Sequence, residues 1–196
     1  STPEIRGTPN RSAVVSLVAT GTAGGGYLQA LPCTAAAGST SNLNTDAAGQ
    51  TRAGLAVVRF DAGGTACVYN SMATHVVVDL QGYLAEGAFD DVTDVRLLDT
   101  RSGSTPRAGS MAVLRGEPNR SAVLSLVATG SLGSGFLQAL PCGSAPGAAS
   151  NLNLDAAGQT RSGLAIVPFG ADGTVCLYTS ATTHLLVDLQ GYFTAG

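Results

Sequence analysis

The two histidines of the chain, His75 and His184, each lie in a Thr-His-x-x-x-Asp segment that ends at Asp79 or Asp188. A histidine held by a carboxylate is half of a hydrolytic triad, so nucleophilic catalysis is the first chemistry to consider. If residues 74–84 form a strand, however, His75 and Asp79 lie on one face about 13 Å apart, at roughly 3.3 Å per residue. That separation is too long for a direct hydrogen bond.

A triad also needs a nucleophile close to the histidine. Ser12, Ser41 and Ser71 are the candidates in the first half of the chain, and none lies in a Gly-x-Ser-x-Gly elbow. The sequence therefore predicts no catalytic residues and no enzyme activity. His75 and His184 remain either polar residues at the rim of a sheet or contacts to a ligand.

The most polar stretch of the chain is Ser41–Asp46, followed by Gly49–Arg52, and both parts recur at 150–155 and 158–161. Asn, Asp, Gln and Arg carry the planar donors and acceptors that read sugar hydroxyls. The same side chains close turns and loops, so both interpretations stay open. The predicted ligand-binding residues are Asn42, Asn44, Asp46, Gln50, Arg52, His75 and Asp79, with Asn151, Asn153, Asp155, Gln159, Arg161, His184 and Asp188 in the second half.

Asp79 interrupts the apolar run Val76–Leu80 with a charge. A charge in an otherwise apolar strand requires a partner or a ligand. Arg96, Arg101 and Arg52 are the candidate partners, and a structural Asp–Arg pair is the favoured interpretation.

The four cysteines, Cys33, Cys67, Cys142 and Cys176, form two pairs that are each 34 residues apart. Matching spacing in the two halves predicts the disulfides Cys33–Cys67 and Cys142–Cys176. Zinc is disfavoured because there is no Cys-x-x-Cys and only one histidine per half, and no metal or cofactor is predicted. Disulfides imply a secreted or cell-surface protein, whose signal peptide is expected to have been removed or to lie outside this sequence.

The elements that position these residues belong to an internal repeat. Residues 7–83 align without a gap onto residues 116–192, and 53 of the 77 aligned positions are identical. Identity at this level predicts two copies of one domain, at residues 1–87 and 88–196. The segment Asp90–Gly103 runs ahead of the second copy and has no counterpart ahead of the first. Either the chain is a fragment of a longer repeat array or its first unit is truncated at the N-terminus. If residues 95–100 form a strand, the first copy lacks that strand and exposes a sheet edge.

Short apolar or alternating runs at 13–20, 27–31, 55–60, 66–70 and 74–84 predict β-strands. Gly-rich turn signals at Gly21–Gly26 and Asp61–Gly64 separate these runs, and Ala171–Thr174 is expected to form a hairpin turn. No helical periodicity extends over a dozen residues. We therefore expect an all-β protein, with two small β-sandwiches or barrels that each contain one disulfide.

Composition removes several classes of function. Charged residues make up 12% of the chain, the net charge is −3, and all ten basic residues are Arg, so no basic stripe is available for nucleic acid. No apolar run approaches the roughly 18 residues of a membrane span. Because there is no Trp, sugar recognition would rest on hydrogen bonds rather than on an exposed Trp surface.

Several short sequence motifs together resemble a repeat module of secreted actinobacterial proteins. These motifs are Arg96–Arg101, Leu140–Gly143, Ser150–Asn153, Gly158–Thr160 and Val187–Phe193. The resemblance implies an extracellular accessory module, appended to a catalytic domain in a longer parent chain, that holds the enzyme on a wall polysaccharide such as arabinogalactan. The chain departs from that pattern at Ser16, Ser125, Gly54 and Gly163, where related modules often carry Asn.

The leading hypothesis is a non-catalytic carbohydrate-binding module that targets the cell wall. Its partner would be a wall polysaccharide, with no nucleic acid and no membrane, and its duplicated sites would raise avidity through effective concentration. The alternative is a structural spacer or adhesion stalk without a ligand of its own.

Overall fold

The computed structural model describes residues 2–38 and 40–194, apart from the side chain of Asp94. Within that range the chain forms fifteen β-strands and no helix, which confirms the all-β prediction. The strands are β1 (Glu4–Arg6), β2 (Ser12–Thr20), β3 (Gly26–Leu31), β4 (Leu43–Thr45), β5 (Arg52–Arg59), β6 (Thr65–Asn70), β7 (His75–Tyr83), β8 (Phe89–Asp99), β9 (Ser110–Arg115), β10 (Ser121–Thr129), β11 (Gly135–Leu140), β12 (Leu152–Leu154), β13 (Arg161–Pro168), β14 (Thr174–Thr179) and β15 (His184–Phe193).

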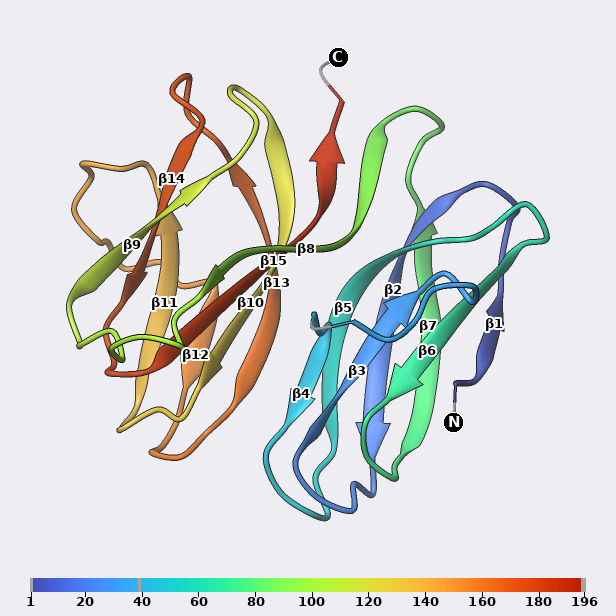
Figure 1. Cartoon of the computed structure of the whole chain (residues 1–196), viewed down its shortest axis with the longest axis horizontal. Helices are drawn as coiled ribbons and strands as arrows, with labels where there is room; N and C mark the ends of the chain where they lie inside the picture. Colours follow the sequence, from blue (N-terminus) through green and yellow to red (C-terminus); the bar gives the residue numbers. More distant parts are fainter. Residues whose placement is uncertain (1, 39, 195–196) are drawn as a thin grey trace.

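The strands form two β-sandwiches that lie side by side (Figure 1). We call them repeat one and repeat two. Repeat one has the sheets β1-β6-β3-β4 and β5-β2-β7, and repeat two has the sheets β12-β11-β14-β9 and β13-β10-β15-β8. All strand pairs are antiparallel.

Strand β2 illustrates why these segments become strands. Its residues alternate, so Ala13, Val15, Leu17 and Ala19 point into the core and are at most 1% exposed. The residues between them lie on the other face of the sheet and are half-buried. This period of two matches the alternation of side chains along a strand, and it fixes which face of the sheet is outward.

Each repeat has its own hydrophobic core, which packs residues from both of its sheets. An aromatic pair closes one part of each core, Phe60 with Tyr83 and Phe169 with Tyr192, at ring-centroid distances of 6.3 and 6.2 Å. The repeated sequence therefore builds the same packing twice.

The turns at Asp61–Gly64 and Ala171–Thr174 are both present, but Ala171–Thr174 does not form the expected hairpin. Each links strands of opposite sheets, β5 to β6 and β13 to β14. Gly64 has φ +72°, and a Cβ there would lie 2.5 Å from the carbonyl oxygen of Gly7, so both the conformation and the space require glycine. The sequence signal identified the turn correctly and the strand pairing wrongly, because turn residues do not encode which sheet the next strand joins.

Strand β8 is the structural difference between the repeats. It pairs with the edge of β15, and it contains most of the strand that was expected at residues 95–100. In the part of the chain that the structure describes, repeat one has no equivalent strand, so β7 pairs only with β2 and is an edge. Strands β1, β4, β9 and β12 were not predicted, and β4 and β12 lie inside the repeated polar segments.

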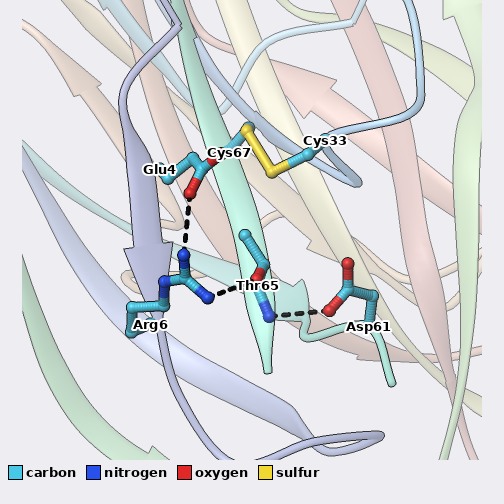
Figure 2. Close-up of a disulfide and its surroundings, with 6 residues drawn as sticks. All are labelled: Glu4, Arg6, Cys33, Asp61, Thr65 and Cys67. Atoms are coloured by element: carbon cyan, nitrogen blue, oxygen red, sulfur yellow. Dashed lines mark hydrogen bonds and ion pairs between the residues drawn. A yellow bond between two sulfur atoms is a disulfide. The ribbon is translucent and has the colours of Figure 1, made fainter. Parts of the chain in front are cut away.

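Both predicted disulfides are present, Cys33–Cys67 and Cys142–Cys176. Figure 2 shows the first, which joins the loop after β3 to β6, next to Glu4 and Arg6 of β1. The two bridges indicate an oxidising environment. No helix long and apolar enough to cross a membrane occurs among the described residues.

The two disulfides are expected to contribute equally to stability, because each closes a loop of 34 residues and each joins a buried cysteine. Replacing both cysteines of either bridge by alanine should lower the free energy of unfolding by about 3–4 kcal/mol in the chain-entropy model. Guanidinium unfolding of the two double variants and the wild type measures this. An unchanged midpoint in either variant would contradict it.

Candidate functional site

The polar segment Ser41–Asp46 of repeat one lies against the outward face of a sheet of repeat two. We call this segment the docking segment. The groups that receive it form the docking face, which consists of Ser125, Thr160, Arg161, Ser162, Asp188 and Gln190. Strand β4 is the centre of the docking segment, and it is held in repeat one by pairing with β3.

The first half of the docking segment is buried by this contact. The Ser41 N–H donates to Asp188 Oδ2 at 3.3 Å, and its carbonyl oxygen accepts from Ser125 Oγ at 2.7 Å. Asn42 Nδ2 donates to Gln190 Oε1 at 3.0 Å, while Asn42 Oδ1 accepts from the Ala30 N–H of its own repeat. Asn42 is only 6% exposed. Its amide therefore connects the two repeats and does not face solvent.

The second half of the docking segment ends in a charged contact. Asp46 Oδ2 accepts from Arg161 Nη1 at 2.8 Å and from the Thr160 N–H at 3.1 Å. Gln50 Nε2 donates to the other carboxylate oxygen. Burial raises the pKa of Asp46, but the hydrogen bonds from Gln50, Thr160 and Arg161 outweigh it and hold the pKa below its ordinary value of 3.8. The Asn44 N–H completes the contact by donating to Ser162 Oγ at 2.9 Å.

At the centre of the docking face is a buried ion pair between Asp188 on β15 and Arg96 on β8. Asp188 is 0% exposed, and Arg96 binds it with two nitrogens, Nε to Oδ1 at 2.7 Å and Nη2 to Oδ2 at 3.1 Å. The hydrogen bond to Asp188 raises the pKa of Arg96. Arg96 also contacts Asp99, whose pKa is held well below 3.8 by hydrogen bonds from Arg101.

The equivalent aspartate of repeat one has a different environment. Asp79 is exposed on the edge strand β7, and the structure describes no ion pair for it. Of the three arginines considered as its partners, Arg96 pairs with Asp188 instead. Asp79 and Asp188 thus share a sequence context but not a role.

The histidines lie apart from the aspartates in their segments. His75 is exposed at the start of β7. His184 Nε2 lies 3.0 Å from Thr105 Oγ1, and its Nδ1 lies 3.1 Å from the Thr100 carbonyl oxygen. Among the described residues neither histidine has a carboxylate within ion-pair distance, and none of their contacts forms a nucleophile–histidine–acid arrangement.

The second copy of the polar segment is open to solvent. Asn151, Asn153 and Asp155 are exposed, and the Asp155 side chain is 79% exposed. Asn151 Oδ1 still accepts from Ala139, as Asn42 does from Ala30, and Gln159 Oε1 accepts from the Asp155 N–H. Local hydrogen bonds therefore hold the two copies in the same conformation, and only the first copy is covered.

A cleft of about 470 Å³ lies where the linker between the repeats passes repeat one. Its polar lining was not predicted from the sequence. It is lined by Asn10, Arg11, Ser12, Arg59, Ala85, Glu86, Gly87, Phe89, Asp90 and Asp91. Arg59 Nη1 pairs with Asp91 at 3.3 Å, and Arg11 stacks over the Tyr83 ring at 5.7 Å. Ser12 Oγ and Arg11 Nε are buried without a hydrogen-bond partner among the described residues.

The cleft could not be found from sequence because its two sides are remote in the chain. The only signals were the repeated Pro-Asn-Arg-Ser word and the acidic pair Asp90–Asp91. The linker between β7 and β8 passes beside the start of β2, and it brings the two sides of the cleft together.

No family model matches the chain, and no curated protein sequence matches it.

The buried ion pair should make the two aspartates respond differently to the same substitution. Asp188→Asn removes the buried charge that Arg96 binds with two nitrogens, and it is expected to destabilise the protein by about 3 kcal/mol. Asp79→Asn is the matched control, and it should change stability by less than about 0.5 kcal/mol because Asp79 is exposed. Chemical unfolding of both variants measures this, and equal losses would contradict the assignment.

Acid should loosen the docking segment before it unfolds the cores. Because the pKa of Asp46 is lowered in the folded protein, its stabilising effect is present above the unfolded value of 3.8 and is lost as the pH falls below it. The protection factor of the Thr160 amide, which donates to Asp46, should therefore be constant near pH 5 and drop as the pH is lowered below 3.8.

Asp46→Asn is the control for this titration. It removes the titrating group, so Thr160 protection should be lower at pH 5 and nearly independent of pH. A wild-type protection factor that stays constant down to the onset of global unfolding would contradict the role of Asp46.

Proposed function

We propose that this chain is a secreted, non-catalytic carbohydrate-binding module that targets an enzyme-bearing parent protein to a cell-wall polysaccharide such as arabinogalactan. The observation that carries the proposal is the polar cleft at the junction of the repeats. The resemblance to repeat modules of secreted actinobacterial proteins supports the wall as the location, and the two disulfides are compatible with it.

The side chains of the cleft suit a neutral, hydroxyl-rich ligand. Arg11 and Arg59 are donors only, Glu86 and Asp90 are acceptors, and Asn10 is both. Charge-assisted hydrogen bonds of this kind are about twice as strong as neutral ones. The volume of about 470 Å³ falls within the roughly 300–1,000 Å³ typical of small-ligand sites, which is enough for a short stretch of a glycan.

The proposed ligand site lies away from the repeated polar segments. Avidity from two equivalent sites requires that both copies be open to the ligand. Asn42, Asp46, Arg161 and Asp188 are engaged between the repeats. Of their counterparts, Asn151, Asp155 and Asp79 are exposed and Arg52 is half-buried. One site at the junction fits that asymmetry better than two identical sites.

Calorimetric titration with arabinogalactan tests the proposal. Arg59→Ala should weaken binding roughly tenfold or more, since a hydrogen bond to a charged group contributes about 1.5–3 kcal/mol. Arg59 is a suitable probe because its side chain is 45% exposed and its replacement leaves the core intact.

Arg115→Ala is the matched control, because Arg115 is an exposed arginine on β9 that does not line the cleft. It should bind like the wild type. If the wild-type chain binds neither arabinogalactan nor peptidoglycan nor other wall glycans, the proposal fails.

A structural spacer is the second candidate, and the docking contact favours it. Six hydrogen bonds fix repeat one on repeat two, and such contacts would keep a stalk of repeats stiff. Under this function the repeated polar segments make packing contacts and bind no ligand, and the glycan titrations would show no binding.

A further inference from the structure

The contact between the repeats joins two different surfaces. Repeat one contributes its docking segment, and repeat two contributes its docking face. The internal repeat means that the chain carries each surface twice, but the contact within the chain uses each only once. One docking segment and one docking face remain without a partner repeat.

The free docking segment is Ser150–Asp155 of repeat two. All six of its residues keep the spacing of the first copy, and only Leu154 differs in type, where repeat one has Thr45. The Asn151 amide oxygen is held by Ala139 just as Asn42 is held by Ala30, which leaves Nδ2 pointing in the equivalent direction. The segment is therefore preorganised in the docked conformation.

The free docking face lies on the outward side of β5-β2-β7 in repeat one. Ser16, Thr51, Arg52, Asp79 and Gln81 occupy the positions of Ser125, Thr160, Arg161, Asp188 and Gln190. Ser16 and Asp79 are directly paired across β2 and β7, as Ser125 and Asp188 are across β10 and β15.

The apolar residues around these surfaces show the same pattern. Leu186 is 5% exposed on the covered face, whereas its equivalent Val77 is 45% exposed on the free face. Beside the covered docking segment Val57 is half-buried, whereas its equivalent Ile166 is 59% exposed. In each pair the residue that belongs to the unused surface is the one left in water, which carries a hydrophobic cost.

We propose that the free docking segment of one chain binds the free docking face of a second copy of the same chain, in the geometry already present between the two repeats. Five of the six hydrogen bonds of the internal contact have both partners available in this second contact. The sixth is lost because Ala53 stands where Ser162 accepts the Asn44 N–H. The charges are complementary, since Asp155 would face Arg52 as Asp46 faces Arg161.

The contact joins unlike surfaces, so it does not complete itself in a dimer. Each added chain again presents one free segment and one free face, and the association is open-ended. The contact is also weaker than the internal one for two reasons. In the described part of the chain, the sheet β5-β2-β7 has no strand equivalent to β8, so Asp79 would lack the ion pair that Arg96 gives Asp188. A short linker also holds the two repeats of a chain at an effective concentration on the order of millimolar, which a second chain lacks.

Sedimentation velocity of the intact chain, up to about 1 mM, tests the proposal at the concentrations the linker argument suggests. The weight-average mass should rise with concentration above the 19.5 kDa of one chain and continue beyond twice that mass. A mass of 19.5 kDa at every concentration overturns the proposal, and so does a mass that stops at the dimer.

Two charge reversals test the two surfaces separately. Asp155→Arg acts on the free docking segment, and Asp79→Arg acts on the free docking face. Because Asp155 also lies 3.7 Å from Arg161, protection of the Thr160 amide verifies that the internal contact persists in the first variant. Each variant alone should remain at the mass of one chain. An equimolar mixture should form dimers and stop there, because only the intact segment of one variant and the intact face of the other can meet.

The matched control is Glu4→Arg, a reversal at an exposed acid on β1 that should associate like the wild type. Thermal unfolding of each variant verifies that it is folded. The fold is expected to be retained because Asp155 and Asp79 are exposed. If either variant alone associates like the wild type, or if the mixture stays at the mass of one chain, these surfaces do not mediate the contact.

Discussion

The buried carboxylate of Asp188 is the constraint on which the arrangement of this protein depends. An ionised carboxylate that loses its water needs charged and hydrogen-bonding partners, and otherwise costs several kcal/mol. Arg96 supplies two of those bonds from β8, and the Ser41 N–H supplies another from the other repeat. The linker strand β8, the sheet edge at β15 and the docking segment are therefore all tied to one side chain. A charge that interrupts an apolar strand is here the point where two domains join.

Duplication has given this chain two sets of nearly identical residues in unlike surroundings. Asp46 and Asp155, or Asp79 and Asp188, have the same neighbours in sequence and opposite exposure. The difference arises because a head-to-tail contact between two repeats covers one face of the second and one segment of the first. The polar segment Ser41–Asp46 is thus packed against repeat two, whereas its second copy, Ser150–Asp155, is open to solvent. The cleft beside the linker is not duplicated, since it needs both the start of β2 and the acidic residues at 90 and 91.

Much of the fold could be predicted because its signals are local. Alternating apolar residues gave the strands at β2, β5 and β7, and equal spacing of four cysteines gave both disulfides. Strands β1, β4 and β12 were missed because three residues are too few to show a period. Strand β9 was missed because its four apolar residues are contiguous and show no alternation with polar ones. The turn at Asp61–Gly64 was recognised by its glycines, but its partner sheet was not. The cleft was missed because Arg11, Arg59 and Asp90 come from separate elements, and no local pattern links them.

The sequence by itself determined the number of repeats, their all-β class, the pairing of the cysteines and the residue types from which any site must be built, without Trp or Lys. These follow from periodicity, spacing and composition, which are properties of the chain alone. Only the tertiary structure decided which copy of each polar residue is buried, because the equivalent polar segments are nearly identical in sequence and differ in what packs on them. Asn42 connects two domains and Asn151 faces water for that reason. The role of a repeated residue in this protein is set by its neighbour in space.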